Sequence, residues 1–129
     1  MIQIDHLDHL VLTVASLERT CAFYADVLGL KVETFGEGRK ALRFGDQKIN
    51  LHLAGHEFEP KAKTPTPGSG DFCFIASTSI ENVIAHLKRL GVPIEHGPVD
   101  KVGAAGPLIS IYIRDLDANL VEIANLRDG

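Results

Sequence analysis

The chain has 129 residues, enough for one ordinary domain but not for two independent hydrophobic cores. Its net charge of -4 excludes the basic surface that nucleic-acid binding needs, and no apolar run approaches the length of a membrane-spanning helix. No signal peptide precedes the first predicted strand, and two cysteines are too few for a disulfide framework. We therefore expect a cytoplasmic protein whose partners are neither nucleic acid nor membrane.

The first half of the chain predicts one strand, one helix and three further strands. The first strand is rich in β-branched residues, and Ser16 can cap a helix in which apolar residues recur at helical spacing until Gly29. The predicted elements are a strand at 7–14, a helix at 17–28, and strands at 31–34, 40–44 and 48–53.

A loop rich in proline and glycine at 55–70 precedes a similar second half. Thr78 and Glu81 fit a capping box, and Gly91 can end the helix that follows. The predicted elements are a strand at 72–76, a helix at 79–90, and strands at 93–95, 109–114 and 120–124. Residues 99–107 contain two glycines and are expected to form a mobile loop.

The two halves thus repeat the order strand, helix, strand, strand, strand. A shift of 62 positions superposes the first strands and the helix ends, and a shift of 70 superposes the last strands. The superposed pairs are His9 with Asp71, Ser16 with Thr78, Gly29 with Gly91, and His52 with Glu122. We therefore predict an α+β fold of two tandem βαβββ modules, about residues 1–62 and 63–129, within one domain of residues 1–129.

Strand alternation gives these superposed positions a chemical meaning. Each polar residue lies on the strand face opposite the apolar residues that pack in the core. The four residues are His9, His52, Asp71 and Glu122. Two imidazoles and one or two carboxylates suit Fe(II), Mn, Ni, Co or Zn, with water or substrate completing the coordination. We expect a curved sheet around a metal-binding cavity that needs both modules.

Three segments carry a more specific pattern: Asp-His-Leu-Val-Leu-Thr-Val at 8–14, Phe-Tyr-x-x-Val-Leu-Gly-Leu at 23–30, and Asp-x-Asp-x-Asn-Leu-Val-Glu at 115–122. In these segments the chain resembles the vicinal oxygen chelate superfamily, which groups glyoxalase I, bleomycin-resistance proteins, fosfomycin-resistance enzymes and extradiol dioxygenases. The resemblance covers nearly the whole chain. The chain also resembles short bacterial proteins of the glyoxalase-domain or virulence-associated type, and single-domain dihydroxybiphenyl dioxygenase-like proteins.

The resemblance implies a divalent metal ion held by residues of four strands. The first-strand ligand matches His9, and the last-strand carboxylate matches Glu122. The fourth-strand ligand, usually Glu in bacterial glyoxalase I, matches His52, and the fifth-strand ligand, usually His, matches Asp71. We expect His9, His52 and Glu122 as ligands, with Asp71 as a fourth ligand, a residue behind the ligands or a general base.

Three functions remain open from the sequence. The first is a glyoxalase I-like isomerase, in which the metal stabilises an enediolate of a 2-oxoaldehyde–thiol hemithioacetal and Glu122 or Asp71 moves the proton. The second is a single-domain Fe(II) dioxygenase that cleaves catechols or dihydroxybiphenyls. The third is a small-molecule sequestering protein of the bleomycin-resistance type. A symmetric homodimer is expected in each case, and the site can close within one chain or across the dimer.

The remaining candidate residues have ordinary structural explanations. Cys73 is expected to be a small buried thiol, and Tyr112 a packed strand residue that becomes a proton donor if its hydroxyl faces the cavity. The arginines at 43 and 114 are expected to be exposed strand residues. The other four histidines, at 6, 56, 86 and 96, are expected at the surface or in loops.

Overall fold

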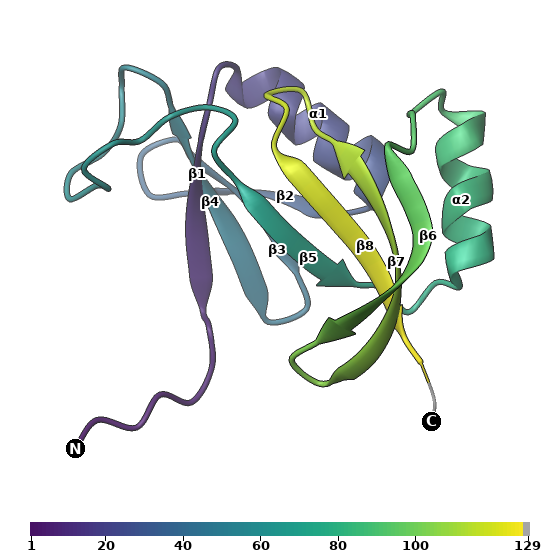
Figure 1. Cartoon of the computed structure of the whole chain (residues 1–129). Coiled ribbons are helices and arrows are strands. Elements are labelled where there is room, and N and C mark those ends of the chain that lie inside the picture. The colour runs from purple at the N-terminus through teal and green to yellow at the C-terminus, as the bar shows by residue number, and fades with distance from the viewer. Residues whose placement is uncertain (128–129) are drawn as a thin grey trace. The chain divides into compact units, whose positions relative to one another are not determined.

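The chain forms two compact units, Met1–Pro67 and Gly68–Gly129, in a computed structural model that describes residues 1–127 (Figure 1). We call them the first and the second module. The first contains β1 (His9–Val14), α1 (Leu17–Leu28), β2 (Lys31–Phe35), β3 (Arg39–Phe44) and β4 (Gln47–Leu53). The second contains β5 (Asp71–Ile75), α2 (Ile80–Arg89), β6 (His96–Gly103), β7 (Gly106–Arg114) and β8 (Leu120–Leu126). The predicted α+β fold of two tandem βαβββ modules is confirmed.

Each module has one four-stranded sheet with the same topology. The strand orders are β1-β4-β3-β2 and β5-β8-β7-β6, with β1 parallel to β4, β5 parallel to β8, and all other neighbours antiparallel. One face of each sheet is apolar and buried, with Leu42, Ile49 and Leu51 in the first module and Val121 and Ile123 in the second. Neither helix within residues 1–127 is long and apolar enough to cross a membrane.

The ends of α1 follow from local sequence, whereas the start of α2 does not. The Ser16 side chain accepts a hydrogen bond from the Arg19 backbone N–H, and Gly29 ends α1 in the left-handed conformation. The N-cap of α2 is Ser79 and not the predicted Thr78. The reason is a residue distant in sequence: the Asn125 side chain accepts from the Ile80 N–H and donates to the Thr78 carbonyl, which fixes where the helix begins.

The predictions of a strand at 93–95 and of a mobile loop at 99–107 are wrong. Strand β6 instead runs through most of that segment and pairs with β7 across a tight turn, where Gly103 faces Gly106. A Cβ at Gly103 would lie 2.8 Å from Leu108 Cδ1. The glycines therefore allow a close hairpin in place of a loop.

Strand pairing also corrects the alignment of the two modules. His9 pairs with Lys48 in the first module, and Asp71 pairs with Leu120 in the second. Position 48 therefore corresponds to position 120, so the counterpart of Glu122 is Asn50 and not His52. A shift of two residues keeps every side chain on its face, so the apolar pattern alone could not reveal the error.

Replacing Gly97 with Ala is expected to lower the free energy of unfolding by about 2–3 kcal/mol. Gly97 has φ 101°, and a Cβ there would lie 2.5 Å from the Ser110 carbonyl oxygen. Gly45 also has a positive φ, but nothing lies within 4 Å of its Cβ position. Gly45→Ala is therefore the matched control for denaturant unfolding, and equal losses in the two variants would contradict the steric argument.

Candidate functional site

The first module contains a pocket of about 440 Å³ on the sheet face that carries His9, opposite the buried apolar face. Strands β1, β3 and β4 supply most of its lining, and the segment after β4 supplies Phe58. The polar lining residues used below are His9, Arg39, Lys48, Asn50 and His52. Sequence alternation predicted His9 and His52 on this face, and the strand register bears this out.

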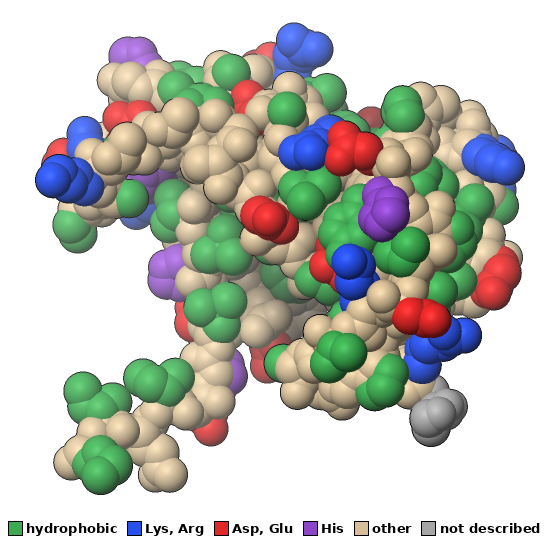
Figure 2. Space-filling view, in the orientation of Figure 1, with side chains coloured by type: hydrophobic (Ala, Val, Ile, Leu, Met, Phe, Trp, Pro, Cys, Tyr) green, Lys and Arg blue, Asp and Glu red, His purple; other side chains and the backbone are tan. Residues whose placement is uncertain are grey.

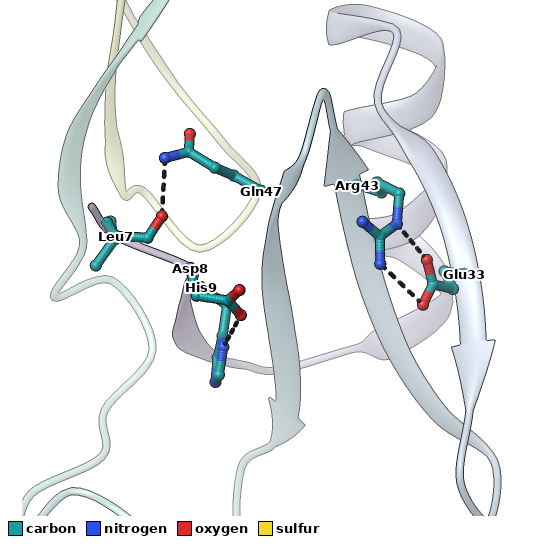
Figure 3. A network of polar contacts seen from close by, with 6 residues as sticks. All are labelled: Leu7, Asp8, His9, Glu33, Arg43 and Gln47. Atoms are coloured by element: carbon teal, nitrogen blue, oxygen red, sulfur yellow. Dashed lines mark hydrogen bonds and ion pairs between the residues drawn. The ribbon is translucent and has the colours of Figure 1, made fainter. Parts of the chain in front are cut away.

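His9 begins β1, and its ring is oriented by its neighbour. Its Nδ1 lies 2.8 Å from Asp8 Oδ2 (Figure 3). The hydrogen bond to His9 lowers the pKa of Asp8, so that carboxylate is ionised and can only accept. His9 Nδ1 therefore donates, which leaves Nε2 as the ring nitrogen that can meet a ligand. A carboxylate behind one ring nitrogen is the usual arrangement of a metal-binding histidine.

His52 is buried, with 4% of its surface exposed, and it faces a cation. Its Nε2 lies 3.4 Å from Arg39 Nη2. Because arginine can only donate, this nitrogen accepts. Burial, and then the Arg39 charge, lower the pKa of His52, so the imidazole is neutral. The guanidinium occupies the direction in which Nε2 would meet a metal ion.

Register adds a second argument about His52. It pairs with Thr13, four residues along β1 from His9. At about 3.3 Å per residue the two histidine backbones are roughly 14 Å apart, which is a long span for side chains that stand perpendicular to a sheet. Both observations weigh against His9 and His52 sharing one metal ion within this module. The ligand role of His52 stays a prediction.

Asn50 is the residue of this face that the sequence analysis missed. It pairs with Val11, two residues from His9 along the sheet. Only 6% of its surface is exposed, and within residues 1–127 its Oδ1 is buried without a hydrogen-bond donor. A buried amide oxygen without a donor is well suited to a cation or to a ligand N–H or O–H. Strand alternation puts Asn50 on the same face as His52, so the sequence contained this signal, but only the strand register shows that Asn50 is the residue nearer to His9.

In the second module, Asp71 and Glu122 are related in strand register as His9 and Asn50 are in the first. Asp71 is exposed at the start of β5, and Glu122 is half-buried in β8, where it pairs with Cys73 and Tyr112. Glu122 and Cys73 line a pocket of about 420 Å³, with Leu108 among its apolar walls. The two carboxylates are thus two residues apart in register, like His9 and Asn50.

Two weak acids stay protonated beside Glu122. Partial burial, and then the Glu122 charge, raise the pKa of the Cys73 thiol to about 11. Burial and the same charge also raise the pKa of Tyr112. Both groups can therefore donate to the Glu122 carboxylate at neutral pH. Contrary to prediction, Cys73 is exposed, because it lies on the face of β5 opposite the half-buried Phe72 and Phe74.

Alkylation of Cys73 is expected to be slow at neutral pH. With a pKa of about 11, about one thiol in a thousand is ionised at pH 8, roughly 100-fold fewer than for a thiol of pKa 9. The rate should keep rising with pH up to about 11. Mass spectrometry after iodoacetamide treatment over a pH series measures it, with Cys73→Ser as the blank. A plateau below pH 10 would contradict the raised pKa.

The other candidates are engaged as ordinary surface residues. Arg43 forms a bidentate pair with Glu33, with Nε 2.6 Å from Oε2 (Figure 3). Arg114 likewise pairs with Glu95 at 2.9 Å. Three of the remaining histidines are exposed and one is half-buried; in order they are His6, His56, His96 and His86.

Within residues 1–127, no three His, Cys, Asp or Glu side chains gather as a metal-binding group. Each module by itself offers two donors, His9 with Asn50 and Asp71 with Glu122. Two donors are fewer than the coordination shell of a divalent cation needs, so neither module forms a complete metal site by itself. In the first module, the unpartnered Asn50 oxygen and the Nε2 of His9 are donors that suit such an ion.

Comparison with known families shows to which protein family the chain belongs. The model of the glyoxalase/bleomycin resistance protein/dioxygenase superfamily matches residues 6–123. The chain belongs to this superfamily. The sequence resemblance is thereby confirmed, and every candidate site residue lies within the matched range. The superfamily includes enzymes such as glyoxalase.

Individual superfamily members are similar over most of the chain. "Virulence protein STM3117" of Salmonella typhimurium is 55% identical over 121 residues, 94% of this chain and 84% of that protein. Its crystal structure has a TM-score of 0.96 and covers 98% of this chain and 100% of that chain. "Glyoxalase domain-containing protein RDO1" of Mycosarcoma maydis is 50% identical, over 99% of this chain and 72% of that protein. The lactoylglutathione lyase of Agrobacterium tumefaciens is 25% identical, with a TM-score of 0.73 and 95% of each chain covered.

Proposed function

We propose that this protein is a divalent-metal-dependent isomerase of the glyoxalase I-like type. Its substrate would be the hemithioacetal of a 2-oxoaldehyde and a thiol, or a related small molecule with two adjacent oxygens. The observation that carries the proposal is the matched placement of two donor pairs, His9 with Asn50 and Asp71 with Glu122, at the same register in both modules. The structural similarity to a lactoylglutathione lyase supports it.

In this proposal the metal ion is held by His9, Asp71 and Glu122, with the fourth-strand position supplied by Asn50 or by His52. Asp8 keeps the His9 ring in the orientation and tautomer that leave Nε2 available. When bound, the cation supplies a Lewis acid that stabilises negative charge on two adjacent substrate oxygens.

The reaction requires one proton to move between neighbouring carbons. We assign Glu122 as the base, because it is half-buried and lines the pocket of its module, whereas Asp71 is exposed. It would take the proton from the hydroxyl-bearing carbon and return it to the former carbonyl carbon, so no oxidant or reductant is consumed. Tyr112 stays protonated and can hold Glu122 in place.

The deciding experiment measures metal content and activity together. Protein purified without added metal is expected to carry one divalent ion per chain and, with Ni, Co or Zn, to form lactoyl-thiol from the hemithioacetal. His9→Ala should lose both. His6→Ala is the matched control, because His6 Nδ1 lies 2.5 Å from Asp5 in the same kind of pair outside β1.

Other outcomes would overturn the isomerase proposal. Bound iron with oxygen uptake on catechols would favour the ring-cleaving dioxygenase. A substoichiometric metal content that is unchanged by His9→Ala would favour the third function, a small-molecule sequestering protein. Equal metal loss in the His9 and His6 variants would remove the evidence for a specific ligand.

The fourth-strand ligand is expected to be Asn50. Asn50→Ala should lower metal affinity at least about tenfold, because it removes an oxygen two residues from His9 in register. His52→Ala should change the affinity by less than twofold, since Arg39 already occupies its Nε2. Competition with a fluorescent chelator measures both. The reverse order of effects would restore His52 as the ligand.

We also propose a symmetric homodimer. The segment of residues 1–8 carries exposed apolar side chains that would gain from a partner surface (Figure 2). They are Ile2, Ile4 and Leu7, at 85%, 81% and 59% exposure. Light scattering of the full chain is expected to give twice the chain mass, and a monomer at micromolar concentration would refute the proposal.

A further inference from the structure

We propose that the first-module pocket binds the carboxylate of a small organic acid through Arg39 and Lys48, two cations that contact the rings of Phe35 and Phe58. The proposal names a substrate class for the proposed function. It rests on that function only in assuming that the substrate binds in this pocket. The pocket volume of about 440 Å³ lies within the range of small-molecule sites.

The Arg39 guanidinium is held by contacts with aromatic rings, which do not neutralise its charge. Its guanidinium carbon lies 5.0 Å from the Phe35 ring centroid and 4.5 Å from that of Phe58. Aromatic rings stabilise the charge of a guanidinium from its faces and leave its N–H groups free to donate in plane. Within residues 1–127 its Nε is buried without an acceptor. A buried N–H without an acceptor costs free energy that a ligand oxygen would recover.

His52 holds one nitrogen of the Arg39 fork. It is neutral and accepts at Nε2, 3.4 Å from Arg39 Nη2, and its own ring lies 5.6 Å from that of Phe58. His52 is therefore a positioning residue for Arg39. The remaining guanidinium N–H groups are the ones that a carboxylate would meet.

The charges on this face show which cations are available. Arg39 and Arg43 lie on the same face of β3, but Arg43 is neutralised by its bidentate pair with Glu33. The ion pairs among residues 1–127 include neither Arg39 nor Lys48. Lys48 Nζ lies 3.9 Å from the Phe35 centroid, so two cations outside these ion pairs flank one ring. Lys48 also lies near enough to Asp8 and Glu33 to help lower the pKa of both carboxyls.

The acidic lining residues limit the charge of the ligand. Asp8 and Glu59 also line the pocket, the first bound to His9 and the second 3.3 Å from Lys61. Two nearby carboxylates disfavour a doubly charged phosphate monoester more than a singly charged carboxylate.

The probe is benzoate, and it is tested on the full chain after chelator treatment, so that metal plays no part. Titration followed by calorimetry or NMR is expected to show benzoate binding at least tenfold tighter than benzamide, which has the same shape without charge. Phenyl phosphate should bind more weakly than benzoate. Arg39→Met should weaken benzoate binding at least tenfold, whereas the matched Arg43→Met should change it less than twofold.

Several results would overturn the proposal: equal binding of benzoate and benzamide, tighter binding of phenyl phosphate, or equal effects of the two arginine variants. Lys48→Met provides a second test if thermal unfolding shows that Arg39→Met is not folded, and it too should weaken benzoate binding. Because the assay contains no metal, absence of benzoate binding would overturn this proposal alone, whereas metal content unchanged in the His9 variant would overturn the proposed function alone.

Discussion

Glu122→Gln is expected to lower kcat for lactoyl-thiol formation at least about 100-fold at saturating metal. Glutamine preserves the size of the side chain and its contact with Cys73 and Tyr112 but cannot accept a proton from carbon. The measurement is a steady-state rate series on metal-loaded protein, with metal content determined for each sample. Glu95→Gln is the control, because Glu95 is a carboxylate of the same module that pairs with Arg114.

A second measurement tests whether the charge beside Cys73 has been removed. The Glu122 charge contributes to the raised pKa of Cys73, after partial burial. Glu122→Gln should therefore lower the pKa of Cys73 and speed its alkylation at pH 8. Faster alkylation with an unchanged kcat would reject Glu122 as the base while confirming its contact with the thiol. A kcat loss of less than tenfold would also reject Glu122 as the base.

Elements with local start and stop signals could be predicted from the sequence. Helix α1 was predicted with its observed bounds, because Ser16 and Gly29 lie directly at its ends. The start of α2 depends on Asn125, more than forty residues away, and was misplaced by one residue. Strand β6 was missed because its glycines serve a hairpin, which only its pairing with β7 reveals.

The candidate site shows the same division between local and tertiary information. Alternation was enough to place His9, His52 and Glu122 on the polar faces of their strands. It could not choose between Asn50 and His52, since the two differ by a full strand period. Nor could it distinguish Arg39 from Arg43, because the difference is a tertiary one: Glu33 neutralises Arg43, and two aromatic rings surround Arg39.

The turn before β8 is expected to be the most sensitive point for stability. Asn119 is 1% exposed, and its Oδ1 accepts from the Gly70 N–H at 2.7 Å. Its Nδ2 and its backbone N–H both donate to the Asp115 carboxylate, at 2.8 and 2.9 Å. Through these hydrogen bonds, the Asp-x-Asp-x-Asn segment joins the start of β5 to the start of β8.

Asn119→Ala should lower the free energy of unfolding by about 3 kcal/mol, because it removes two side-chain hydrogen bonds from a buried turn, one of them to a carboxylate. Denaturant unfolding measures the loss, and Asn82→Ala, at an exposed position of α2, should lose less than about 0.5 kcal/mol. A loss below 1 kcal/mol in Asn119→Ala would mean that water replaces the hydrogen bonds of the Asn119 side chain.

Because Gly70 precedes Asp71 and Asn119 lies three residues before Glu122, the variant should also bind metal more weakly under native conditions. Unchanged metal affinity in the folded variant would show that the two carboxylates do not act as one pair.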